Sequence, residues 1–188
     1  IGCTHGNNST QTWMAMTALD SNRAKAQVAN KCNVAISDIK KMTIWGNHSP
    51  TMYPDLDNAE INNESVSALI NDNSWIEKDF LQIVQQRGKA IIDARGASSA
   101  TSAANAAIDT VKATLSETAE DDWFSAAVMS DGSYNVPEGI IFGFPLRANS
   151  SGKISIVQNL PISEYAQNKI DLTTQELLDE KKDISDLL

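Results

Sequence analysis

The sequence predicts an α/β protein, of the α+β kind, in which a mainly antiparallel, twisted sheet packs against long helices. Three apolar segments rich in β-branched and aromatic residues lie at 123–129, 139–146 and 153–158, separated only by turn segments. This succession is typical of an antiparallel sheet. Long segments with apolar residues at helical spacing precede and follow the strands. Neither GxGxxG nor GxxxxGK(S/T) occurs, and the order of elements is not a run of βαβ units.

The composition is that of a folded globular domain. Of the 188 residues, 41% are hydrophobic and 21% are charged, and the formal net charge is -9. We expect no nucleic-acid partner, because phosphate contacts need clustered Lys and Arg, which are scattered here. No apolar run approaches the roughly 18 residues of a membrane span, and the amino end has no signal-peptide pattern. We therefore expect a cytoplasmic protein with no membrane partner.

Cysteine and histidine are too scarce in this chain to form a disulfide framework or a structural metal site. The only cysteines, Cys3 and Cys32, give no disulfide framework. Cys3 and His5 together supply two potential ligands in a polar tail, whereas a structural metal site needs about four. No metal is expected.

The first half of the chain predicts one helix, one strand and a loop. The segment 1–16 is polar at its start and has no apolar period, so we expect it to be irregular and distinct from a domain over 17–188. An Ala-rich helix is expected over 19–31. A strand is expected over 40–46, followed by a loop over 46–59 that contains two prolines and several Asn and Asp residues.

Two long helices should come next in the chain. After a weak strand signal at 59–63, Ser74 and Glu77 form a capping box, which predicts a helix that ends at Gly96. A second helix, rich in Ala and Ser, is expected over 98–115.

The carboxyl end of the chain is expected to be helical again. Thr173 and Glu176 form a second capping box, so the last helix should begin close to Thr173, with Leu177 and Leu178 on its apolar face.

Three polar residues near these elements have the chemistry of a catalytic site. Asp20 and Arg23 lie three apart on the first helix and project from nearly the same face. His48 follows a strand in a Gly-Asn-His-Ser loop, where rigid scaffolds often present functional groups. By spacing alone, a surface ion pair and a structural histidine are the favoured explanation of these residues.

Longer motifs around these residues carry a resemblance to a known family. The segments are LDSNRAKAQ, IWGNHSPTMYPD, VQQRGKAIIDARGASSATSAANAAI, SDGSYNVPEGIIFGFP and DLTTQELLDEKK. They closely resemble the malate dehydrogenases of the lactate/malate dehydrogenase superfamily, in the group shared by many bacteria and the eukaryotic cytosol. The resemblance covers about residue 16 to the end, and it matches only the second of the family's two halves, the substrate-binding domain.

The resemblance implies roles for four residues. His48 matches the family's proton donor and acceptor, and Asp20 matches the carboxylate that pairs with this histidine. Arg23 matches the arginine that binds the substrate carboxylate, and Ser98 matches a residue that lines the substrate pocket. The chemistry agrees, because histidine titrates near neutral pH, a carboxylate favours its charged form, and a guanidinium binds a carboxylate through two hydrogen bonds.

The resemblance also implies an activity, a cofactor and a second subunit. It implies a homodimeric, NAD-dependent enzyme of the tricarboxylic acid cycle that interconverts malate and oxaloacetate. The GxGxxG half is absent, so we expect a truncated chain that is inactive alone. The alternative is a stand-alone, non-catalytic domain that associates with itself or binds a dicarboxylate.

Overall fold

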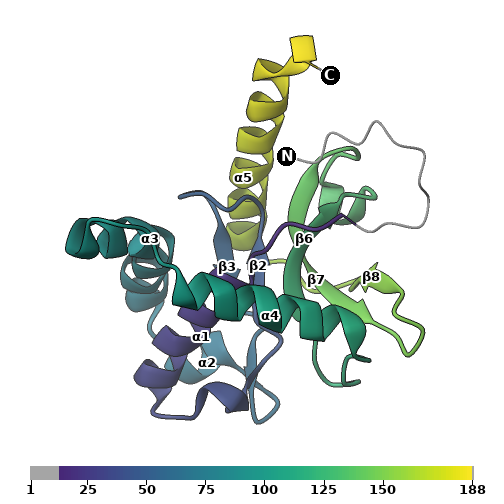
Figure 1. Cartoon of the computed structure of the whole chain (residues 1–188). Helices are drawn as coiled ribbons and strands as arrows, with labels where there is room; N and C mark the ends of the chain where they lie inside the picture. Colours follow the sequence, from purple (N-terminus) through teal and green to yellow (C-terminus); the bar gives the residue numbers. More distant parts are fainter. Residues whose placement is uncertain (1–12, 188) are drawn as a thin grey trace.

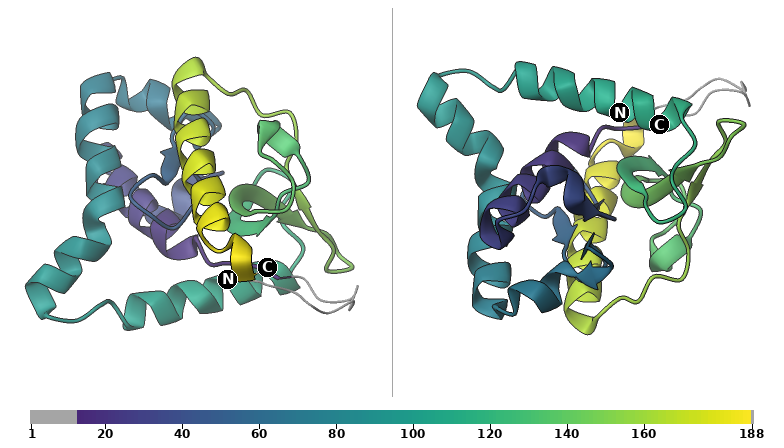
Figure 2. Two further views of the ribbon diagram at one scale, coloured as in Figure 1. Left: turned by 90° about the horizontal axis from the view of Figure 1, so that it is seen from above. Right: turned by 90° about the horizontal axis from the view of Figure 1, so that it is seen from below.

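The computed structural model describes residues 13–187, so most of the segment 1–16 lies outside the described residues. In Figure 1 the sheet formed by β6, β7 and β8 lies on one side of the molecule, and the helices α1, α2 and α3 lie on the other. Between them, the short strands β2 and β3 pack beside helix α5. Figure 2 shows α3 and α4 as an L-shaped arm around this body. The α/β class expected from the sequence is confirmed.

All strand pairs among the described residues are antiparallel, as expected. The first sheet contains β1 (Ile39–Lys40), β4 (Glu60–Ile61) and β5 (Glu64–Ser65). The second contains β2 (Thr43–Trp45) and β3 (Tyr53–Asp55). The third contains β6 (Phe124–Met129), β7 (Ile141–Ala148) and β8 (Ile154–Ile156), which correspond to the three segments predicted as consecutive strands.

A close approach of two glycines connects the second sheet to the third. Gly46 and Gly143 form an antiparallel bridge, with N···O distances of 3.2 and 2.9 Å. A Cβ on Gly143 would lie 2.5 Å from the backbone oxygen of Ile44, so no side chain fits here. The end of β2, and the loop that follows it, are thereby fixed against the central strand β7.

The long helices were located correctly by their periodicity, with errors at their ends, whereas the short helix over residues 66–70 was not expected. They are α1 (Ala18–Cys32), α2 (Val66–Ile70), the π-helical turn η2 (Trp75–Phe80) that continues into α3 (Leu81–Arg95), α4 (Thr101–Leu115) and α5 (Glu164–Asp183). Short 3-10 turns lie at η1 (Ile36–Asp38), η3 (Ser133–Asn135) and η4 (Ser185–Leu187). Helix α1 ends at Asn33, which adopts the left-handed conformation, and α3 ends at Gly96 in the same way.

Both capping boxes expected from the sequence were wrong. Ser74 makes no side-chain cap; instead Asp72 Oδ1 accepts a hydrogen bond from the backbone N of Trp75 at 3.0 Å. Helix α5 begins at Glu164, much earlier than expected, because the Ser163 hydroxyl caps it by accepting from the Ala166 backbone N.

Two strand expectations also need correction. The segment 40–46 is not one strand, because Lys41 has a φ of +59° and interrupts it between β1 and β2. The backbone N of Lys41 donates to Asp122 Oδ1 at 2.7 Å, which stabilises this break. The expected loop 46–59 contains β3, whose buried Asp55 accepts a hydrogen bond from Trp45 Nε1 at 3.0 Å.

The core consists of two apolar clusters that meet at β2. Ile44 belongs to the cluster beneath α1, α2 and α3, and Trp45 belongs to the cluster between β7 and α5. Successive side chains of a strand point to opposite faces, so this short strand contributes to both clusters. Because β2 is buried on both faces, it fixes the beginning of the loop 46–52, which carries His48 and is called the His48 loop below.

None of the helices within residues 13–187 is long and apolar enough to cross a membrane.

Candidate active site

Asp20, Arg23 and His48 come together around one buried carboxylate. Asp20 lies in the first turn of α1, and its side chain is 0% exposed. Its Oδ1 accepts a hydrogen bond from Arg23 Nη1 at 3.0 Å. Its Oδ2 lies 2.5 Å from His48 Nδ1, although 28 residues separate the two in sequence. One carboxylate therefore binds a guanidinium and an imidazole through separate oxygens.

The charge on Asp20 stabilises the protonated form of His48. The hydrogen bond that the ring donates to Asp20 raises the pKa of His48, while partial burial and the positive charge of Arg23 act in the opposite direction without overcoming it. With Nδ1 held by the carboxylate, Nε2 is the nitrogen left to face a ligand. The His48 side chain is 56% exposed, so this nitrogen is open to a molecule from solvent.

A serine hydroxyl in β6 aligns the two elements that carry these groups. Ser125 Oγ accepts a hydrogen bond from the backbone N of Ile44 at 2.9 Å, next to the end of β2. The same hydroxyl lies 3.1 Å from Thr17 Oγ1, immediately before α1. Ser125 and Thr17 are both buried, so each hydroxyl needs a hydrogen-bond partner within the protein, and each provides one for the other. The start of α1 and the end of β2 are thus fixed relative to each other.

Helix α5 holds the His48 loop from the other side. The backbone N of Asn47 donates to Thr173 Oγ1 at 2.9 Å. Glu176, one turn along α5, accepts hydrogen bonds from side chains on both sides of His48. Sequence reasoning missed the roles of Thr173 and Glu176, because their spacing was interpreted as a capping box. No local pattern in the sequence indicates that they contact a loop more than a hundred residues away.

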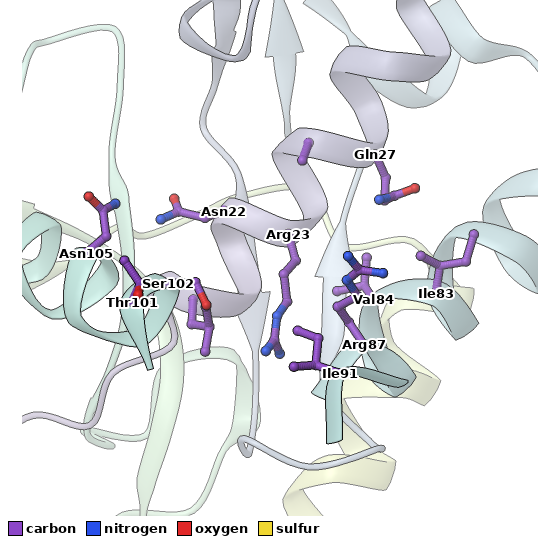
Figure 3. A pocket seen from close by; sticks show the side chains of 12 residues that line it. Asn22, Arg23, Gln27, Ile83, Val84, Arg87, Ile91, Thr101, Ser102 and Asn105 are labelled. Atoms are coloured by element: carbon purple, nitrogen blue, oxygen red, sulfur yellow. The ribbon is translucent and has the colours of Figure 1, made fainter. Parts of the chain in front are cut away.

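A pocket of about 680 Å³ opens beside Arg23, between α1, α3 and α4 (Figure 3). Its lining combines apolar and polar side chains: Leu19, Asn22, Arg23, Ala26, Gln27, Ile83, Val84, Arg87, Ile91, Thr101, Ser102 and Asn105. In Figure 3 the Arg23 side chain extends from α1 into the space between α3 and α4, beside Ile91. The neighbouring position on α3 is Gly88, where a Cβ would lie 3.9 Å from Arg23 Nη1. Arg23 therefore connects the buried carboxylate to the pocket.

Ser98, the fourth residue predicted for the site, is not brought to the other three. It is exposed in the connection between α3 and α4, where its backbone oxygen accepts a hydrogen bond from Arg95 at 3.5 Å. Ser98 does not line the pocket, whereas Thr101 and Ser102 at the start of α4 do. Within residues 13–187, no cluster of His, Cys, Asp and Glu could hold a metal ion.

The chain matches one protein family along nearly its whole length. The family described as lactate/malate dehydrogenase, alpha/beta C-terminal domain, matches residues 17–188. A crystal structure of malate dehydrogenase from Naegleria fowleri is 43% identical in sequence, with a TM-score of 0.86, and the match covers 93% of this chain and 53% of that one.

Lactate dehydrogenases share the fold as well. The Trichomonas vaginalis lactate dehydrogenase in complex with NADH and oxamate is 30% identical, with a TM-score of 0.85, over 90% of this chain and 53% of that one. Malate dehydrogenase from Plasmodium falciparum, 24% identical with a TM-score of 0.78 over 93% of this chain and 55% of that one, shows the same fold. The chain spans about half the length of these structures.

Proposed function

This chain belongs to the lactate/malate dehydrogenase family, as its alpha/beta C-terminal domain, and from this premise we propose that it is the catalytic half of an NAD-dependent malate dehydrogenase. The observation that carries the proposal is the Asp20 carboxylate, which binds both His48 and Arg23. In the proposal, Asp20 orients the histidine, His48 transfers the proton, and Arg23 binds the substrate carboxylate.

His48 fits the role of general acid and base. Reduction of a 2-keto acid places negative charge on the carbonyl oxygen. An imidazolium whose Nε2 faces that oxygen stabilises the charge and then donates its proton, a contribution of roughly 10²–10⁴-fold. In the reverse direction the neutral ring accepts the hydroxyl proton of the 2-hydroxy acid. Asp20 supports both states, because it holds Nδ1 in one orientation and raises the pKa of the ring.

Arg23 fits the role of substrate clamp. Asp20 engages Nη1 of its guanidinium, which leaves further N–H groups available toward the pocket. A carboxylate matches two parallel N–H donors, so a keto acid bound in this way has a fixed orientation. The short connection from Arg23 through Asp20 to His48 then places the proton donor relative to the bound carboxylate.

The residues of the site fit substrate binding and proton transfer, but the sequence supplies no motif that would hold a dinucleotide cofactor. The 188 residues contain no GxGxxG turn, which is the element that approaches a pyrophosphate closely. We therefore assign no residue of this chain to holding NAD. The proposal is that NAD binds to another part of the enzyme, and that this chain alone does not turn over substrate.

The choice of malate rests on similarity. The chain is 43% identical to a malate dehydrogenase and 30% identical to a lactate dehydrogenase, both over at least 90% of its length. We extend the proposal to a cytoplasmic enzyme of the tricarboxylic acid cycle on the same resemblance.

The test is to restore a complete enzyme. Residues 17–188 would be joined to the amino-terminal half of the Naegleria fowleri malate dehydrogenase, and NADH oxidation would be measured with oxaloacetate and with pyruvate. We expect turnover with oxaloacetate, and none from this chain alone. A well-folded fusion that reduces neither acid would contradict the proposal.

An exposed apolar face on α4 bears on the oligomeric state of the enzyme and on the alternative function, a non-catalytic module that associates with itself. Ile108, Val111 and Leu115 lie on one side of this helix and are 54%, 55% and 79% exposed. Such a face favours association, so we propose that the enzyme is a homodimer in which α4 is buried. If the chain is instead a non-catalytic module, it should self-associate without any activity in the fusion. Size-exclusion chromatography with light scattering on the wild type and on Leu115→Glu distinguishes a dimer from a monomer.

A further inference from the structure

A single carboxylate on α5 binds the polar side chains around His48. Glu176 Oε2 accepts a hydrogen bond from Asn47 Nδ2 at 3.1 Å. It also accepts from the Ser49 hydroxyl and from the Thr51 hydroxyl, each at 2.5 Å. One of these donors precedes His48 and two follow it. The His48 ring itself bonds to Asp20 on α1 instead.

A second contact on the same helix face reinforces the attachment. Thr173 Oγ1 accepts from the backbone N of Asn47 and lies 2.9 Å from Thr51 Oγ1. Thr173 is fully buried, whereas Glu176 is partly buried. The loop is therefore fixed to α5 at both of its ends, while the His48 ring, 56% exposed, extends beyond it toward α1.

We propose that Glu176 is a positioning residue of the reaction, which holds the His48 loop so that the imidazole meets Asp20. This inference rests on the proposed function for its catalytic consequence. Its structural part does not depend on turnover: Glu176 on α5 determines how much of the time His48 is hydrogen-bonded to Asp20 on α1. Glu176 touches neither the imidazole nor the pocket, so it acts through the loop.

Glu176 is well suited to this role because it is ionised. Partial burial acts to raise the pKa of Glu176, but the hydrogen bonds from Ser49, Thr51 and Asn47 outweigh it and leave the pKa below its ordinary value. Hydrogen bonds to a charged acceptor are shorter and roughly twice as strong as those between neutral groups.

The charged groups around His48 come from two helices. Asp20 and Arg23 face the ring from α1. On α5, Glu176 and Glu180 both bind Asn47, with Glu180 Oε1 accepting from Nδ2 at 2.9 Å. Any substitution of Glu176 therefore changes both the hydrogen bonding of the loop and the charge near it, and a test must separate the two effects.

The test is the NMR titration of the His48 ring in this chain. The sequence contains only one other histidine, His5, which His5→Gln removes from the spectrum. In that background, Glu176→Ala should lower the His48 pKa toward about 6.5, the value of a free imidazole, because the bond to Asp20 is occupied less of the time. Glu176→Gln keeps an acceptor oxygen without the charge, so it should restore part of the shift.

The matched control is Asp179→Ala, which removes one negative charge three residues along α5. Asp179 accepts a hydrogen bond from Gln175 and none from the loop. It should leave the His48 pKa unchanged. The inference is overturned if Glu176→Ala titrates like the wild type, or if the alanine and glutamine variants shift equally, because charge alone would then explain the result.

A second variant covers the case in which Glu176→Ala does not fold. The double substitution Ser49→Ala/Thr51→Val removes two donors but keeps the Glu176 charge. It should also lower the His48 pKa, and an unchanged value overturns the inference.

Turnover then separates the inference from the proposed function. In the joined enzyme, Glu176→Ala should lower kcat by about 10- to 100-fold with little change in KM, as expected for a misplaced catalytic group. If the joined enzyme fails but the His48 pKa shifts as described, the proposed function is wrong and the positioning contact stands. If the joined enzyme is active but the pKa does not shift, the proposed function stands and the positioning role of Glu176 is wrong.

Discussion

Gly46, at the end of β2, lies so close to Thr173 of α5 that a Cβ at this position would come within 2.1 Å of Thr173 Cγ2. The backbone of Gly46 has a φ of +92°, a conformation that glycine adopts without strain. The close approach brings the backbone N of Asn47 within 2.9 Å of Thr173 Oγ1. The direction in which the chain leaves β2 toward His48 thus depends on the lack of a side chain at Gly46.

The first prediction concerns this contact. Gly46→Ala should lower the free energy of unfolding by about 1–3 kcal/mol, because alanine is strained at this positive φ and its Cβ also clashes with Thr173. Gly152→Ala is a matched control, since its φ is +78° but no atom lies within 4 Å of the added Cβ. Urea denaturation of both variants measures the difference. Equal losses would show that the contact with Thr173 does not matter.

The second prediction concerns the buried carboxylate. Asp20→Ala leaves the Arg23 guanidinium, only 13% exposed, without its partner, and should cost about 3–5 kcal/mol of stability. Asp93→Ala breaks the exposed pair with Lys89 and should cost about 0–1 kcal/mol. Thermal and urea unfolding of the two variants provide the comparison. A loss for Asp20→Ala as small as that for Asp93→Ala would refute the buried pair.

The third prediction is a pH dependence of stability. Asp20 raises the folded-state pKa of His48, so the protonated ring stabilises the fold. This contribution is fully present below the unfolded pKa of about 6.5 and is lost as the pH rises through the folded value. The difference in unfolding free energy between the wild type and His48→Gln should therefore shrink from pH 5 to pH 9. A difference that grows with pH would have the wrong sign.

The fourth prediction concerns substrate binding. In the joined enzyme, Arg23→Lys should raise KM for the keto acid by about 10- to 100-fold, because a lysine cannot supply the two parallel donors. Arg95→Lys, at the exposed end of α3, should leave KM unchanged. Steady-state kinetics test both. An unchanged KM in Arg23→Lys would mean that another group binds the carboxylate.

Elements that follow from local periodicity could be predicted from the sequence. Helix α1 begins and ends within one residue of expectation, because its Ala-rich segment is bounded by Asn33. The strands β6, β7 and β8 were located by apolar runs between turns. By contrast, β3 lies in a segment rich in proline and aspartate, and its stability comes from pairing with β2 and from the bond between Trp45 and Asp55.

The site also combines residues that local motifs indicate with residues that only contacts between distant segments reveal. The motifs around Asp20, Arg23 and His48 were informative, and the structure brings these three residues together. Glu176 could not be found in this way, because its partners in the His48 loop lie more than 120 residues earlier in the chain. Its local spacing from Thr173 imitates a capping box, and only the folded chain shows what the two residues bind.

The most direct test of the proposed mechanism is the turnover of the joined enzyme with and without His48. Single-turnover reduction of oxaloacetate by NADH would be measured in the wild type and in His48→Gln, which keeps a polar side chain but cannot act as an acid near neutral pH. We predict a fall in the rate of the chemical step of at least about 10²-fold, with the fold intact. A rate within a few-fold of the wild type would contradict the assignment of His48 as the proton donor.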